Sequence, residues 1–231
     1  MNKKISVVFV LIMSILVLSS CSNNKSANVQ KTDSKSVNND KKIEDIVYEG
    51  KLIYDTTDIK SMLDNTEKVI LVEGLNYQDT IIKKGKPVPK TVYTAKHLQI
   101  LDKGYDTSKD LYSQLTTYNN ESSKVIMSGG IMTKGEVYDN LSDEYKDKSA
   151  GPKQAVKPSK EEVNTKVRVY IDNYLEFNNE KTYLIFAQTE DNNFYCSGYT
   201  VFEYDKDSKT FTNEFSKLQF KIEDLMKHIK Q

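Results

Sequence analysis

The run Thr182-Tyr-Leu-Ile-Phe-Ala-Gln188 is apolar through its centre and rich in aromatic and branched side chains. A short apolar run of this kind, bounded by polar residues, is typical of a β-strand. Upstream of it, Val167, Val169 and Ile171 alternate with Arg168, Tyr170 and Asp172. This period of two is that of a half-buried strand. The last third of the chain therefore indicates a β-rich domain.

The same signals recur on both sides of this region. Further strands are predicted at Ile46–Tyr54, Val69–Val72 running on toward Tyr77, Thr91–Leu101, Val125–Met132, Phe194–Tyr204 and, after a hairpin turn at Asp205–Lys209, Thr210–Thr212. We expect Val69–Val72 to be buried on both sides. The pair Gly129 and Gly130 indicates a bulge or a close approach of two backbones.

Helix signals are few and short. Thr56-Thr57-Asp58 offers an N-cap before Ile59, Met62 and Leu63, which share one helical face, and Asp64-Asn65 ends that helix. Leu225, Met226 and Ile229 predict a second helix at the end of the chain, and a third is expected around Lys160–Val163. Periodicity leaves 110–118 open between a strand and a short helix. The sequence thus predicts an α+β fold, predominantly antiparallel β, as a small barrel or curved sheet with two or three short helices.

The N-terminus has the pattern of an export signal. Lys3 and Lys4 precede an apolar segment from Ile5 to Leu18, which is shorter than the roughly 20 residues that span a bilayer. Small residues follow in Leu18-Ser-Ser-Cys21. We interpret 1–20 as a signal peptide, 21–43 as a lipidated cysteine with a disordered polar tether, and 44–231 as one extracytoplasmic domain with a polar loop at 145–166.

Leu18-Ser-Ser-Cys21 resembles the lipobox of Gram-positive (Firmicutes) bacterial lipoproteins. The resemblance implies that Cys21 carries fatty acyl chains such as palmitate and anchors the protein to the cell membrane, facing outside. Two or more acyl chains anchor a protein stably to a membrane, whereas a protein with one chain binds the membrane reversibly. Val69–Gly74, Ile100–Gly104, Val125–Gly130 and Tyr183–Phe186 are similar to segments of uncharacterised secreted lipoproteins. Those proteins imply an OB-like or netrin-like barrel.

Composition restricts the partners. Lys and Arg number 33 against 33 Asp and Glu, so no basic excess predicts binding to nucleic acid. Arg168 is the single arginine, and this preference for lysine is typical of AT-rich genomes. Once Cys21 is lipidated, Cys196 remains alone, which excludes an intramolecular disulfide and a cysteine-based zinc site. No cofactor or metal is expected.

Catalytic patterns are absent from the sequence. His97 and His228 lack metal-ligand spacing, and no Gly-x-Ser-x-Gly motif occurs. Asp205 and Asp207 lack the glycine and distal glutamate of a calcium loop, and a hairpin turn explains them. We interpret Cys196, in phase with Phe194, as a core residue. These observations predict a protein that is not an enzyme.

Aromatic residues near the C-terminus offer a candidate ligand surface. Tyr195, Tyr199 and Val201 share a face of the predicted strand with Ser197 and Glu203, and Tyr170 projects beside Arg168. Such a strip can stack on a glycan or clasp a peptide. Equally, tyrosine is a common half-buried strand residue. The sequence favours a membrane-anchored binding or interaction module for a peptide, glycan or protein partner. The alternatives are a hydrolase of cell-wall material and an immunity or conjugation accessory lipoprotein.

Overall fold

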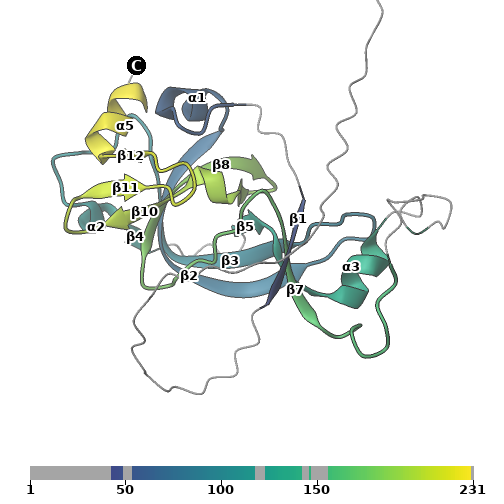
Figure 1. Cartoon of the computed structure of the whole chain (residues 1–231). Coiled ribbons are helices and arrows are strands. Elements are labelled where there is room, and N and C mark those ends of the chain that lie inside the picture. The colour runs from purple at the N-terminus through teal and green to yellow at the C-terminus, as the bar shows by residue number, and fades with distance from the viewer. Residues whose placement is uncertain (1–42, 49–53, 118–122, 142–145, 147–155, 230–231) are drawn as a thin grey trace, which may run out of the picture. The chain divides into compact units, whose positions relative to one another are not determined.

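The computed structural model describes residues 43–48, 54–117, 123–141, 146 and 156–229 (Figure 1). All of them belong to one compact unit, Lys41–Gln231. The predicted signal peptide, Cys21 and the tether up to residue 42 lie outside the described residues. So do 49–53 of the predicted first strand and most of the first half of the 145–166 loop.

Five strands close into a barrel. They are β2 (Lys68–Ile81), β3 (Lys90–Ile100), β5 (Val125–Ser128), β8 (Thr182–Glu190) and β9 (Asn193–Cys196). The strands pair in the order β8-β2-β3-β5-β9, and β9 pairs back onto β8. All of these pairs are antiparallel except β5 with β9. The predicted fold class, an α+β protein with a small barrel, is confirmed.

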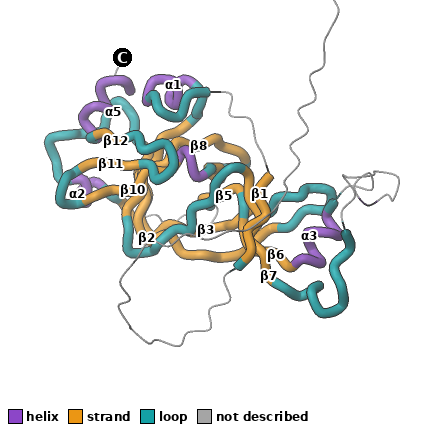
Figure 2. Tube along the Cα trace, in the orientation of Figure 1, coloured by secondary structure: helices purple, strands orange, loops and turns teal. Residues whose placement is uncertain are grey.

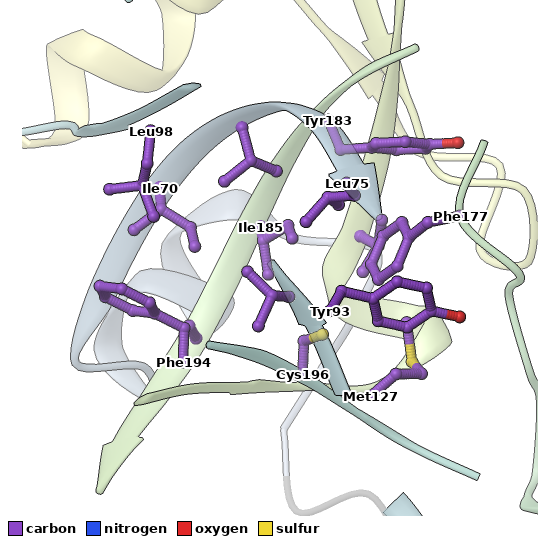
Figure 3. Close-up of a cluster of buried hydrophobic side chains, with 14 residues drawn as sticks. Ile70, Leu75, Tyr93, Leu98, Met127, Phe177, Tyr183, Ile185, Phe194 and Cys196 are labelled. Carbon is purple, nitrogen blue, oxygen red and sulfur yellow. The ribbon is translucent and has the colours of Figure 1, made fainter. Parts of the chain in front are cut away.

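The side chains of the barrel strands contribute to two hydrophobic cores. Ile70 points into the barrel with Ile185 and Phe194 (Figure 3), and Val72 belongs to the same core, whereas Val69 and Leu71 belong to an outer core. The outer core is covered by β10 (Val201–Asp205), β11 (Thr210–Thr212), β12 (Gln219–Phe220) and the helices α1 (Ile59–Asp64), α2 (Leu111–Gln114) and α5 (Ile222–Ile229). The short strand β4 (Thr116–Thr117) pairs with β3. Because both faces of β2 are covered here, Val69–Val72 is buried on both sides, as predicted.

A smaller sheet carries the third core. Its strands are β1 (Glu44–Tyr48), β7 (Lys166–Ile171) and β6 (Gly130–Thr133), in the order β1-β7-β6. Helix α3 (Lys134–Asn140) follows β6 directly, and Figure 2 shows it beside this sheet. Met132, Val137, Val167 and Val169 are buried together. The predicted alternation along β7 is therefore correct for its two central valines.

At Gly74 the side of β2 that points into the barrel changes from the even-numbered to the odd-numbered residues. Up to Val72 the even-numbered residues of β2 enter the barrel, but after Gly74 the inward residue is Leu75. Gly74 has φ +66°, and a Cβ on it would lie 2.7 Å from Cβ of Lys96. Glycine alone adopts this conformation without strain. From Leu75 to Ile81, β2 pairs with β3 alone among the described strands, whereas β3 also pairs with β5 along Thr91–Tyr93. We call residues 74–81 and 90–97 the ribbon.

Several local predictions are confirmed. Asp58 caps α1 by accepting from the backbone N–H groups of Lys60 and Ser61, and Asn65 ends the helix. The turn at 205–209 joins β10 to β11 as a hairpin, in which the Asp205 carboxylate accepts from the N–H of Asp207. The segment 110–118, for which the sequence left strand and short helix as alternatives, contains both, because α2 is closely followed by the two-residue strand β4.

Two predictions are wrong. The helix expected around Lys160–Val163 is a turn, in which Val163 N–H donates to the Ser159 carbonyl. The strand expected at 194–204 breaks at Ser197 into β9, a 3₁₀ helix η2 (Gly198–Thr200) and β10. Thr200 closes this turn on the Ser197 backbone. Gly198 leaves no room for a side chain, because an added Cβ would lie 2.7 Å from the Phe215 ring.

Candidate functional site

The candidate site is a cavity of about 680 Å³ that the ribbon lines in part. Three walls enclose it: the ribbon, the β6–α3–β7 region, and the irregular segment 172–181, which we call the strap. The ribbon contributes Leu75, Asn76, Tyr77, Thr80, Thr91 and Tyr93, with Ile82 beyond it; the β6–α3–β7 region contributes Ile131, Met132, Thr133, Glu136 and Lys166; the strap contributes Tyr174, Glu176, Phe177, Asn178 and Asn179. We call this space the mouth cavity. Its volume is that of a small-ligand site.

Phe177 fixes the strap to the barrel. Its ring lies between Tyr93 and Tyr183, with centroids 4.9 Å and 5.0 Å away in edge-to-face geometry (Figure 3). The Tyr183 hydroxyl accepts a hydrogen bond of 2.9 Å from Asn178 N–H. The floor of the mouth cavity is therefore a set of packed rings joined to the barrel core.

Tyr77 differs from these rings because it is 60% exposed. Its ring meets Tyr93 edge-on at 6.3 Å, and its hydroxyl lies 3.3 Å from Thr80 Oγ1. Two contacts thus hold an exposed ring at the rim. An aromatic side chain placed in this way offers contact area to a ligand at little cost in conformational entropy.

The hydroxyl group of Tyr93 lies in a polar cluster. Burial raises its pKa, and the neighbouring Tyr174 hydroxyl and Glu176 carboxylate raise it further, while a hydrogen bond with the Phe177 backbone lowers it. Tyr93 therefore stays protonated over the whole physiological range. Its hydroxyl group is hydrogen-bonded to the Tyr174 side chain and to the Phe177 backbone, which ties the cavity floor to the strap.

Tyr174 is held from the side of the small sheet. Tyr170 stacks on it at 6.0 Å, and the Arg168 guanidinium carbon lies 5.7 Å from its ring centroid. Arg168 also pairs with Asp45 of β1 at 3.3 Å. These contacts join the strap to β7 and β1.

The wall opposite the strap is formed by the start of α3. Thr133 and Glu136 form a capping box, in which the Glu136 carboxylate accepts from Thr133 N–H at 2.8 Å and from its hydroxyl at 3.0 Å. Lys166 stands beside Thr133 in the β6–β7 register. Among the described residues, neither Lys166 nor Glu176 makes an ion pair, so the cavity has one uncommitted charge of each sign.

The residues singled out from the sequence do not form one surface. Tyr195 lies under Lys90, whose Nζ is 4.4 Å from the ring centroid, and Tyr199 packs on Phe215. Val201 is buried in the barrel core, so the predicted strip is wrong where the strand breaks. Tyr170 alone approaches the mouth cavity, through Tyr174.

Two further residues have clear positions. Cys196 is buried in the barrel core, which confirms the prediction, and burial raises the pKa of its thiol. His97 Nδ1 lies 3.1 Å from Glu73 Oε2 across the β2–β3 ladder. Neither His97 nor Glu73 lines the mouth cavity.

Sequence reasoning missed the residues of this cavity. Tyr77, Tyr93, Tyr174, Glu176 and Phe177 come from segments that are far apart in the chain, and the strap has no periodicity that marks its inward side chains. One available signal was Thr-x-x-Glu at 133–136, which predicts the start of α3.

The part of the chain that the structure describes contains no group of three or more His, Cys, Asp or Glu placed to hold a metal ion. None of its helices has the length and apolar character needed to cross a bilayer. In comparisons with protein-family models, curated proteins and solved structures, nothing matches this chain.

Proposed function

We propose that this protein is a lipid-anchored binding protein on the outer face of a Gram-positive cytoplasmic membrane, and that its ligand occupies the mouth cavity. Anchoring through Cys21 is supported by the lipobox Leu18-Ser-Ser-Cys21. The tether behind it would let the domain reach partners near the membrane surface.

The observation that carries the binding site is the exposed, ordered ring of Tyr77 at the rim of a 680 Å³ cavity. Tyrosine is enriched among the residues that contribute most to binding at protein interfaces. Polar groups around the ring supply orientation: the Asn76 and Asn178 amides, the Glu176 carboxylate and the Lys166 ammonium. A few polar groups set among apolar ones is the usual composition of a ligand site.

The experiment compares four tyrosines in one binding assay. The full chain in a mild non-ionic detergent is titrated by calorimetry with muropeptides from digested peptidoglycan and with an N-acetylglucosamine tetramer. We expect saturable binding of at least one probe that weakens by about tenfold or more in Tyr77→Ala, which corresponds to 1.4 kcal/mol. Tyr195→Ala and Tyr199→Ala serve as matched controls. Tyr170→Ala tests whether the stacking of Tyr170 on Tyr174 contributes to the affinity. Weakening in Tyr195→Ala or Tyr199→Ala with none in Tyr77→Ala would move the site away from the mouth cavity.

A second candidate is a wall hydrolase, because Glu136 and Glu176 line the same cavity and paired carboxylates can act as acid and base. The commitment of Glu136 to the α3 capping box favours binding instead. Turnover of peptidoglycan fragments by the wild type that disappears in Glu176→Gln would establish the hydrolase.

A further inference from the structure

The mouth cavity contains two charges that no ion pair compensates. Glu176 lies on the strap, and Lys166 lies on β7, in the region that forms another wall. Among the described residues neither side chain makes a salt bridge, so the two do not pair with each other either. The other acidic residue of the cavity, Glu136, accepts two hydrogen bonds from Thr133 in the capping box. Glu176 and Lys166 are therefore the charged groups best placed to meet a ligand.

Filling the cavity would change the surroundings of both charges. Glu176 and Lys166 are exposed, so water solvates them. A ligand in the cavity displaces part of that water, and a charge that loses water without gaining a partner of opposite sign weakens binding. A neutral ligand leaves both charges in this position, and a ligand with a single charge leaves one of them. A ligand with an ammonium group and an acidic group compensates both.

Aromatic rings gather at the Glu176 end of the cavity. The ring of Tyr93 is nearly perpendicular to that of Tyr77, at 80°, and to that of Phe177, at 89°. Glu176 precedes Phe177 in the chain, and its carboxylate lies near enough to Tyr93 to raise the pKa of that hydroxyl. The faces of aromatic rings attract ammonium groups, and a nearby carboxylate adds to the attraction. This end therefore suits an ammonium, whereas Lys166, the cation among the lining residues, suits an acidic group.

We propose that the ligand of the mouth cavity is a zwitterion, whose ammonium group lies against Tyr77 and Glu176 and whose acidic group, a carboxylate or a phosphate, pairs with Lys166. This rests on the proposed function and names the chemical class of ligand for the same cavity. Amino-acid stems of wall material and zwitterionic lipid headgroups share this chemistry, and the test separates the two sources.

The test measures the binding of matched probes to the full chain in a mild non-ionic detergent by calorimetry. The stem probe is Nα-acetyl-lysyl-D-alanyl-D-alanine; its Nε-acetyl derivative lacks the ammonium, its C-terminal amide lacks the carboxylate, and the compound with both changes is neutral. The headgroup probe is glycerophosphocholine, with choline and dimethyl phosphate as its cationic and anionic parts. We expect saturable binding of one zwitterion, and about tenfold or more weaker binding of each of its singly charged forms.

Two variants that remove one charge each locate the groups. Glu176→Gln should weaken the zwitterion about tenfold and change the affinity for the probe without an ammonium less than about threefold. Lys166→Gln should weaken the zwitterion similarly and have little effect on the probe without an acidic group. Glu180→Gln and Lys160→Gln are the matched controls, because both side chains are exposed and neither lines the mouth cavity.

Binding of the neutral probe as tight as that of its zwitterion would overturn the proposal. So would equal weakening by Glu176→Gln of probes with and without the ammonium, or the absence of saturable binding by both zwitterions. If the uncharged N-acetylglucosamine tetramer binds in a Tyr77-dependent way and neither zwitterion does, this inference fails and the proposed function stands. If Tyr77→Ala weakens no probe that binds, the proposed function fails as well.

Discussion

Replacing Phe177 with alanine should separate the strap from the barrel. The side chain is only 8% exposed and makes edge-to-face contacts with Tyr93 and Tyr183. Burial of the ring is worth about 3–5 kcal/mol on truncation. Each aromatic pair contributes about 0.5–1.5 kcal/mol beyond the burial of its area. Phe177→Leu keeps most of the apolar volume but loses both pairs, so it should lower the free energy of unfolding by about 1–3 kcal/mol.

The assay is equilibrium urea unfolding of the full chain in detergent, followed by tyrosine fluorescence and far-UV circular dichroism. Val156→Ala is the control, because Val156 is 89% exposed and its loss should change the free energy of unfolding by less than about 0.5 kcal/mol. Phe177→Ala should also weaken ligand binding, since Glu176 and Asn178 flank it on the strap. A cost below about 1 kcal/mol for Phe177→Ala would refute the reasoning that the strap is packed into the barrel core.

Three other outcomes follow from the account. Cys21→Ala should abolish labelling by a fatty-acid probe and release the protein from membranes, and a labelled, membrane-bound variant would contradict the anchor. Gly74→Ala should cost more than Gly85→Ala by urea unfolding, because both glycines have positive φ but only Gly74 would bring a Cβ against Lys96; equal costs would remove the packing argument. Burial raises the pKa of Tyr105 from 10.0 to about 12, with Asp110 adding to the shift, so the unfolded chain releases this proton first. Tyr105 should then contribute on the order of 2 kcal/mol to the fall in the free energy of unfolding between pH 10 and 12, and Tyr105→Phe should lose that part while the other buried tyrosines keep theirs; an identical slope in the variant would disprove this assignment.

Local signals in the sequence predicted the elements whose formation depends on neighbouring residues. Asp58 caps its helix through its own carboxylate, Val69–Val72 is apolar on both faces, and the 205–209 turn bonds to itself. Each of these follows from residues within a few positions, which is what periodicity and capping rules can detect.

The remainder depends on contacts between distant residues. Closure of the barrel requires β9 to pair with β5, about 70 positions earlier, and nothing in 193–196 specifies that partner. The predicted tyrosine strip assumed that alternation continues through Ser197, but Gly198 packs on Phe215 and Asn173 and turns the chain. The mouth cavity combines 75–82, 91–93, 131–136, 166 and 174–179. Only the folded chain places these segments together.

The central claim is that the mouth cavity receives the ligand outside the cell. Photocrosslinking in intact cells tests it most directly, with a benzophenone amino acid in place of Gln78 at the exposed ribbon rim and, in a parallel strain, in place of Tyr199. The account predicts a ligand adduct from position 78 that is lost when Tyr77 is also changed to alanine, and none from position 199. Adducts from position 199 alone would contradict it.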